Sequence, residues 1–347
     1  MRWFTAVCVL AGLVGLAACN KGSSVPTPNF TPTPSASPSA TPSPYMGPRI
    51  GAYNVAPTTT TVTTYPLLST GFTNPTQLIT GSATGLGPGT AGIAFDQSGN
   101  IYVGVGNTTT TILVFNASAT QNTPPMRTMQ LPILALGIAT DALGNFYTAN
   151  FMNGAIYRFR VSGSGIVSPT QTFTPYLDTP SGFRVAFPHA LNTGGNALFC
   201  GCAVSSNGTV STAGVSEYTF SSSGTAQLED SFYDTELTRA PQAIAVDTVA
   251  KVVYLGETVN GAPAIFAYAY PRGGSVKPQR TITGNNTGIQ SINGLAVGPD
   301  EELYVADAGS HQIEVFAPNA NGNAVANRVI SDPNMQFSPV GNSIAIH

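Results

Sequence analysis

The feature of this sequence that most constrains its fold is a four-strand unit that repeats along most of the chain. In its clearest copy, residues 292–331, four short apolar runs read LAV, ELYVA, QIEVF and RVIS, with turn residues between them. Successive side chains of a strand point to opposite faces, so such runs predict short β-strands. Self-similarity at a fixed period indicates a repeat architecture, in which each unit packs against the next.

The copies align in one register, and the aligned positions suggest how the units are arranged. The first strand repeats an alanine preceded by Ile or Leu, at residues Ala94, Ala139, Ala245, Ala296 and Ala345. The third strand ends in an aromatic residue, at spacings of 50, 44, 59, 50 and 48 residues: Tyr65, Phe115, Phe159, Tyr218, Tyr268 and Phe316. Fourth strands follow at Ile79, Met129, Phe173, Phe232, Ile282 and Ile330. Small residues suit strands near an axis, and four strands at this period predict a β-propeller blade.

The two ends of the chain complement each other. At the C-terminal end, residues 342–347 match the first strand of a repeat, but no second, third or fourth strand follows them. At the N-terminal end, the second, third and fourth strands of a repeat are present without a first strand, at residues 50–54, 62–65 and 77–80. A blade shared between the termini closes the ring and removes its exposed edges. We therefore predict an all-β fold, a six-bladed β-propeller of four-stranded blades, over residues 49–347. A β-sandwich or β-solenoid does not explain the complementary ends.

The N-terminal segment has the form of a bacterial lipoprotein precursor. Residues 1–18 carry one cation, Arg2, before a mostly apolar run, which is typical of a secretory signal. Residues 16–19, LAAC, resemble a lipobox, and we expect cleavage before Cys19 and lipid attachment to it. The resemblance to bacterial lipoproteins implies that Asn20, which follows the cysteine, favours the outer membrane if the cell has one. Residues 19–48 are rich in Pro, Ser and Thr and are expected to form an extended tether between this anchor and the propeller.

Composition limits the classes of partner. Charged residues make up 8% of the chain and the net charge is −3, so there is no electrostatic case for binding nucleic acid. Two cysteines, Cys200 and Cys202, remain beyond the N-terminal segment. Alternate strand residues share a face but lie near the upper limit for a disulfide. A strained disulfide, two half-buried thiols and, less readily, a metal site are the alternatives.

At the level of motifs, the repeat resembles NHL-type repeat proteins. The resemblance is carried by residues 92–103, GIAFDQSGNIYV, and by residues 278–282, PQRTI. It implies a propeller that serves as a protein-binding platform or a lyase, or, as in the more distantly similar senescence-marker/gluconolactonase group, a metal-dependent lactonase. Fold alone does not decide among these functions.

The lactonase group implies a metal on the propeller axis, held by side chains that precede the first strands. Asn293 resembles one such ligand, and the equivalent positions in other blades are Ala91, Leu136, His189, Gln242 and Asn342. None of these is a carboxylate, which a hard divalent cation prefers. Glu257 and Asp307, at the ends of two second strands, are the acids expected nearest the mouth of the axial channel. We therefore predict no metal, no cofactor and no catalytic residue.

His189 is the histidine that bears on the lyase alternative. The blade around it, residues 188–232, is the poorest copy, and its register is uncertain by two residues. In one register His189 faces the pore, and in the other it is a hydrogen-bonded core residue.

The prediction is a lipid-anchored binding or scaffold module for a protein, peptide or glycan. Its candidate ligand contacts at the axial mouth are His189, Gln242, Glu257, Asn293, Asp307 and Asn342.

Overall fold

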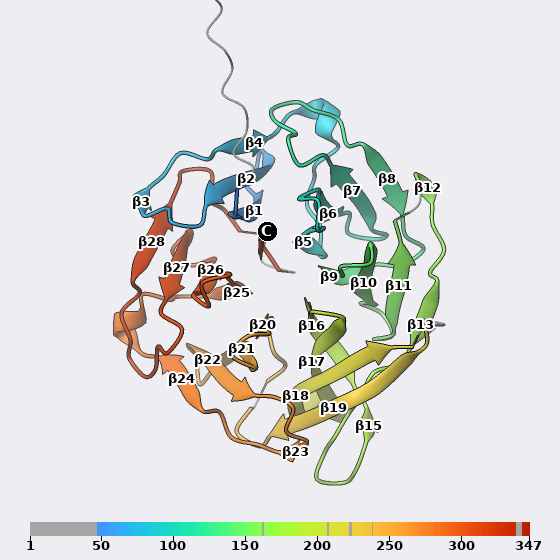
Figure 1. Ribbon diagram of the computed structural model, residues 1–347, viewed down its shortest axis with the longest axis vertical. Coiled ribbons are helices and arrows are strands. Elements are labelled where there is room, and N and C mark those ends of the chain that lie inside the picture. The colour runs from blue at the N-terminus through green and yellow to red at the C-terminus, as the bar shows by residue number, and fades with distance from the viewer. Residues whose placement is uncertain (1–46, 162, 207, 222–223, 238, 338–341) are drawn as a thin grey trace, which may run out of the picture. The chain divides into compact units, whose positions relative to one another are not determined.

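Six sheets of four or five strands surround a central axis in the computed structural model (Figure 1). The structure describes residues 47–161, 163–206, 208–221, 224–237, 239–337 and 342–347. The described residues form one compact unit. The predicted signal, Cys19 and most of the predicted tether lie outside the described residues. No described helix is long and apolar enough to cross a membrane.

Each blade is an antiparallel sheet whose strands follow one another outwards from the axis. Blade 1 contains β5 (Gly92–Phe95), β6 (Ile101–Val105), β7 (Thr111–Phe115) and β8 (Arg127–Gln130). Blade 2 contains β9 (Ala135–Thr140), β10 (Asn145–Asn150), β11 (Ile156–Arg160) and β13 (Gln171–Phe173). Blade 3 contains β16 (Phe187–Gly194), β17 (Ala197–Ser206), β18 (Thr209–Phe220) and β19 (Ala226–Asp234).

The remaining blades follow the same order. Blade 4 contains β20 (Ala243–Asp247), β21 (Val252–Val259), β22 (Ala262–Ala269) and β24 (Arg280–Thr283). Blade 5 contains β25 (Ile292–Val297), β26 (Leu303–Asp307), β27 (Gln312–Phe316) and β28 (Arg328–Ser331). The terminal blade contains β29 (Ile344–Ile346), β1 (Arg49–Val55), β2 (Thr60–Pro66) and β4 (Gln77–Ile79). The predicted six-bladed propeller is therefore confirmed.

The terminal blade closes the ring as predicted. β29 pairs with β1 in antiparallel register, with Ile346 opposite Ile50 and Ile344 opposite Ala52. The Arg49 side chain then links this blade to blade 1: it is 1% exposed and donates to Gly99 O (2.8 Å) and Ala117 O (3.1 Å). A buried guanidinium held by two carbonyls of the neighbouring blade fixes the position of the first blade relative to the last.

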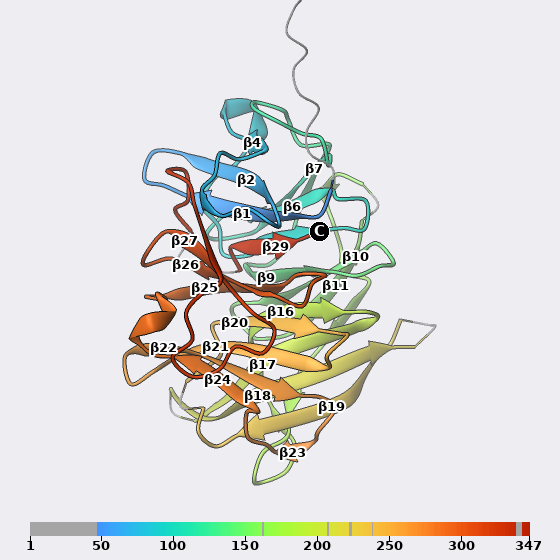
Figure 2. The ribbon, with the colours of Figure 1, turned by 60° about the vertical axis from the view of Figure 1, so that its left-hand side comes forward.

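Neighbouring blades lie against one another around the ring (Figure 2), and the core lies between them, not within them. There are six clusters of buried apolar residues, each joining the facing sides of two adjacent blades. Each cluster contains one of the six periodic aromatics: Tyr268, Tyr65, Phe316, Phe159, Tyr218 and Phe115. Each aromatic packs against the preceding blade, so the sequence period reflects one large buried side chain at every blade interface.

The fourth strands are covered by a further element that the sequence does not predict. At five junctions, the loop between the third and fourth strands of one blade pairs in parallel with the fourth strand of the preceding blade. Three of these segments form fifth strands, β3 (Gly71–Phe72), β12 (Gly165–Ile166) and β23 (Gly274–Ser275). At the junction of blades 2 and 3, the described residues show no such pairing, and Arg158 donates to Gly224 O instead (3.4 Å). The expectation of four strands per blade holds for three blades only.

Blade 3 departs furthest from the repeat. A small hairpin, β14 (Tyr176–Leu177) and β15 (Arg184–Val185), precedes it and packs on β18 and β19. Cys200 and Cys202 on β17 form a disulfide with a Cα–Cα distance of 5.4 Å. Both are fully buried between blades 2 and 3. Of the three alternatives for these cysteines, the structure shows the disulfide.

The aspartates that recur in the first hairpin of the blades stabilise its turn. Asp96 Oδ1 accepts from Ser98 N and Asn100 N (both 2.9 Å), and its Oδ2 accepts from Asn100 Nδ2 (2.9 Å) and Tyr102 Oη (3.3 Å). Asp141 repeats this set in blade 2. Both carboxylate oxygens are therefore used within the hairpin, where they offset the turn's unpaired amides.

Candidate functional site

A cavity of about 260 Å³ lies on the propeller axis and is lined by residues of all six first strands. These strands, β5, β9, β16, β20, β25 and β29, each stand at one end of their sheet. Their inner edges therefore present backbone N–H and C=O groups towards the axis. The recurring alanines Ala94, Ala139, Ala296 and Ala345 belong to the lining, as expected for strands near an axis.

Four polar side chains also line this axial cavity: Thr140, Asn192, Thr193 and Asn342. Three of them join neighbouring first strands. Thr140 donates to Phe95 O, Thr193 donates to Thr140 O (2.6 Å), and Asn192 Nδ2 donates to Ile244 O (3.2 Å). These bonds cross from blade 2 to 1, from 3 to 2 and from 3 to 4, so they fix the inner ring around the cavity.

The two asparagines keep hydrogen-bonding capacity. Asn342 Nδ2 donates to Ile344 O (2.8 Å), whereas its Oδ1 is buried and has no partner among the described residues. Asn192 Oδ1 likewise accepts no bond from the described part of the chain. None of the described lining residues is ionisable. The cavity is thus an uncharged site with free amide acceptors.

Of the residues predicted for the axial mouth, only Asn342 lines the cavity. Asn293 lies beside it, 7% exposed, at a bulge of β25, and accepts a hydrogen bond from Ser343 Oγ. Gln242 is exposed, and its Oε1 accepts from Thr258 Oγ1 (3.0 Å). The structure therefore does not bring the three amides together around one point. Their role in binding stays a prediction.

His189 occupies a bulge of β16 between Pro188 and Ala190, the position that Asn293 has in β25. The repeat register that aligns His189 with Asn293 is therefore the one observed, but His189 does not line the axial cavity. Its ring packs against Phe187, with centroids 5.4 Å apart, and makes no hydrogen bond to the described residues. Burial lowers its pKa below the ordinary value of about 6.5. The imidazole is therefore neutral at pH 7.

Glu257 and Asp307 are fully buried and bind backbone rather than facing the axial mouth. Asp307 accepts from Gln290 N (2.8 Å), Ser291 N (2.7 Å) and Gly309 N (2.8 Å). Glu257 accepts from Arg239 N (2.8 Å). In the terminal blade, Asn54 at the same position accepts from Gln336 N (3.3 Å). In three blades, a polar side chain at the end of the second strand thus holds the loop that leads into the first strand.

A further acid, Glu314 on β27, lies 2% exposed near Asp307. Burial, and to a smaller extent the negative charge of Asp307, raises the pKa of Glu314 to about 8. Ser310 Oγ donates to one of its oxygens (3.1 Å), and the other has no partner in the described chain. Sequence reasoning missed this residue because alternating Glu and apolar residues read as a strand with one solvated face. Across residues 47–347 as described, no three His, Cys, Asp or Glu side chains are placed to hold a metal ion.

Comparison with known proteins agrees with the geometry of the repeat. Residues 290–316, which contain β25, β26 and β27, match the family model described as NHL repeat. The chain is an NHL-repeat-like six-bladed β-propeller. The repeat that the family model matches contains the bulged Asn293 and both buried acids, Asp307 and Glu314. No curated protein sequence matches this chain.

The propeller is similar in fold to several solved structures. A chain of a nidogen/laminin complex aligns with a TM-score of 0.54 at 12% identity, covering 86% of this chain and 98% of that chain. A putative 6-phosphogluconolactonase from Bacteroides uniformis aligns with a TM-score of 0.53 at 13% identity, covering 86% and 99%. Its counterpart from Bacteroides fragilis gives 0.54 at 11% identity, covering 90% and 100%. At these identities the similarity establishes the fold alone.

Proposed function

We propose that this NHL propeller is a binding module whose axial cavity takes a neutral polar ligand, with a glycan segment as the best fit. The observation that carries the proposal is the uncharged lining, in which Asn192 Oδ1 and Asn342 Oδ1 accept no hydrogen bond from the described residues. Sugar hydroxyls both donate and accept hydrogen bonds, so they complement asparagine amides and the open backbone edges of the first strands. The cavity of about 260 Å³ gives room for about one sugar ring.

A metal-dependent lactonase or lyase is the alternative function. Two of the similar structures are described as putative 6-phosphogluconolactonases. A metal at the axis needs carboxylate ligands, and the acids considered for this role, Glu257 and Asp307, accept hydrogen bonds from loop amides instead. We therefore favour the binding module.

Saturation-transfer NMR with a panel of neutral mono- and disaccharides tests the axial site. We expect binding in about the millimolar range, because one sugar ring makes few contacts. Asn192→Ala and Asn342→Ala are each expected to weaken it roughly tenfold, the effect of losing one buried hydrogen bond. Asn116→Ala, at an exposed turn, is the matched control. Triglycine amide is tested in the same way as a neutral peptide, and if it alone binds, the ligand is a peptide. If neither Asn192→Ala nor Asn342→Ala weakens binding, the axial cavity is not the binding site.

We further propose that the chain is tethered to the cell envelope, outside the cytoplasm, by lipid on Cys19. The support is the apolar run and LAAC motif of residues 1–19, followed by the Pro-rich segment up to residue 48. The Asn20 side chain favours the outer membrane where one exists. A tether of this composition gives the propeller reach to ligands at some distance from the membrane.

Replacement of the lipidated cysteine gives a direct test of the tether. Cys19→Ser is expected to move the protein from the membrane fraction to the soluble fraction, because the lipid chains provide the membrane affinity. Fractionation and immunoblotting measure the change, with Cys8→Ser as the control that leaves the lipobox intact. Retention of Cys19→Ser in detergent-requiring fractions contradicts lipid anchoring and assigns the anchor to the apolar run itself.

A further inference from the structure

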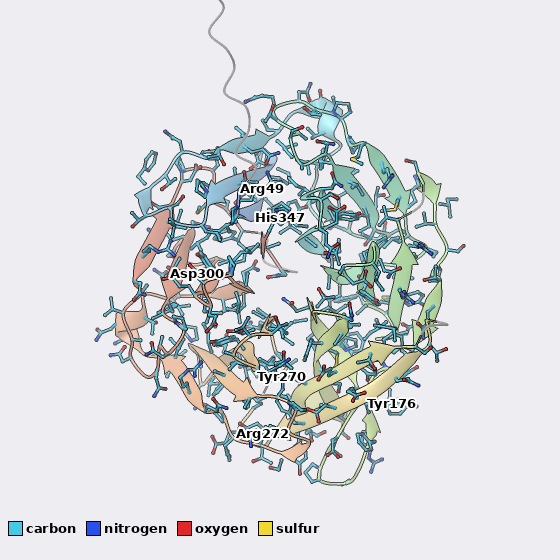
Figure 3. The ribbon with its side chains drawn as sticks, viewed as in Figure 1. Arg49, Tyr176, Tyr270, Arg272, Asp300 and His347 are labelled. Carbon is cyan, nitrogen blue, oxygen red and sulfur yellow. A yellow bond between two sulfur atoms is a disulfide. The ribbon has the colours of Figure 1, made fainter. Side chains whose placement is uncertain are left out.

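A second cavity, of about 400 Å³, lies where the first strands of blades 4 and 5 and the terminal blade end. Its apolar walls are Val246, Val249, Val297, Pro299, Ile346 and Pro48, and we name it the Asp247 cavity after its buried acid. Val246, Val297 and Ile346 also line the axial cavity, so the two are adjacent. Figure 3 looks onto this side of the ring, with His347 near the centre and Asp300 on the neighbouring blade.

Asp247 departs from the pattern of its repeat. Its Oδ1 accepts from Val249 N (2.9 Å) and Ala250 N (2.8 Å), as the equivalent aspartates do. In blades 1 and 2 the other oxygen binds an asparagine and a tyrosine, but Val252 replaces the asparagine here, and the Tyr254 hydroxyl is directed to Pro318 O instead (3.4 Å). Asp247 Oδ2 is therefore buried without a partner in the described chain, on a residue only 3% exposed. A carboxylate oxygen in this state is costly unless a donor reaches it.

Glu301 is a second departure, and it faces the same cavity. The equivalent turn position carries Gly99 in blade 1 and Gly144 in blade 2, both with positive φ. Glu301 keeps this left-handed conformation (φ 62°), which disfavours a side chain. A carboxylate thus stands where the fold prefers glycine.

The charges around the Asp247 cavity are unbalanced. Its described lining contains two side-chain carboxylates, Asp247 and Glu301, and the imidazole of His347, but no lysine or arginine. Neither acid forms an ion pair among the described residues. The nearby cations are engaged elsewhere: Arg280 donates to Tyr254 Oη (3.1 Å), and Lys251 lies over the Tyr270 ring.

We propose that the Asp247 cavity binds a primary ammonium group carried on an aliphatic stem. The ammonium donates to Asp247 Oδ2 and is attracted by Glu301, while the valine and proline walls cover the stem. The lysine side chain of a partner peptide and a free alkylamine share this chemistry. A bare divalent cation fits less well, because it needs six or more oxygen ligands and the walls are apolar.

Calorimetric titration of the full chain tests this site with three probes. These are N-acetyl-lysine methylamide, n-pentylamine and, as the neutral isostere, N-acetyl-norleucine methylamide. We expect the amines to bind in about the millimolar range and the isostere at least about tenfold more weakly, because it lacks the charge that the two acids attract. Tighter binding of the lysine derivative identifies a partner peptide; equal binding of pentylamine identifies a free amine.

Two variants separate binding from folding. Asp247→Asn keeps the Oδ1 acceptor for the turn amides and is expected to weaken amine binding at least about tenfold. Glu301→Gly restores the glycine of blades 1 and 2, so it is expected to weaken amine binding several-fold without lowering the melting temperature. Asp141→Asn, whose carboxylate is fully engaged in blade 2, is the control. Absence of amine binding, equal binding of the isostere, or no effect of Asp247→Asn overturns the proposal, and none of these outcomes bears on saccharide binding at Asn192.

Discussion

Deletion of residues 342–347 is expected to abolish cooperative thermal unfolding and to make the protein aggregate. This segment supplies β29, the innermost strand of the terminal blade, which pairs with β1. Its loss exposes the edge of β1 and removes Ile344 from the core between blade 5 and the terminal blade. Calorimetry and light scattering measure the effect, because an open ring has two unpaired edges on which other chains can pair.

A milder variant tests the same closure in a protein that still folds. Arg49→Met keeps the length of the side chain but loses the donors to Gly99 O and Ala117 O, so it leaves two buried carbonyls without this partner. We expect destabilisation of about 3 kcal/mol or more, which calorimetry detects as a lower melting temperature. Arg184→Met, on exposed β15, is the control. If the protein that lacks residues 342–347 melts like the parent, or if Arg49→Met does, the termini do not close the ring through a shared blade.

Glu314→Gln is expected to stabilise the protein, and more so at pH 8 than at pH 5. Because the folded-state pKa of Glu314 is raised from its usual 4.5 to about 8, the folded state keeps a proton that the unfolded state releases. The free energy of unfolding is therefore unaffected by this group below about pH 4.5. It falls as pH rises from 4.5 towards 8, by up to about 1.4 kcal/mol per pH unit. Glutamine mimics the protonated acid, so at pH 8 we expect a gain of about 2–4 kcal/mol, allowing for relaxation around the site.

Thermal melts of parent and variant at pH 5 and pH 8 measure this difference. Glu229→Gln, at an exposed position of β19, is the matched control and is expected to change stability little at either pH. A Glu314→Gln variant whose advantage is the same at both pH values shows that Glu314 is ionised in the folded protein.

The fold could be predicted because the residues that pack the blades together recur at a regular period in the sequence. One buried aromatic per blade interface and one alanine in five of the six inner strands produce the period, and the complementary ends predict closure. The parallel fifth strands were not predictable, because they are backbone pairings of turn segments such as residues 71–72 and 274–275. Backbone pairing between segments remote in sequence leaves no side-chain pattern.

The candidate site was less accessible from sequence. Asn192 occupies the position of the recurring alanine, but blade 3 was too poor a copy to align, so this lining residue was missed. Glu257 and Asp307 were expected near the axial mouth because they end second strands, yet backbone amides of the loops draw both inwards. The repeat in the sequence predicts where a residue lies along its strand. The direction of an acidic side chain at the end of the strand depends instead on its hydrogen bonds to loop amides.

A melting scan in excess EDTA, followed by millimolar calcium, tests most directly whether this propeller is a metal-independent binding module. We expect no shift in melting temperature, because the axial cavity offers amides where a divalent cation needs carboxylates. A reproducible rise of several degrees with calcium, removed by Asn293→Ala or Asn342→Ala, contradicts it and favours a metal-dependent hydrolase at the axis.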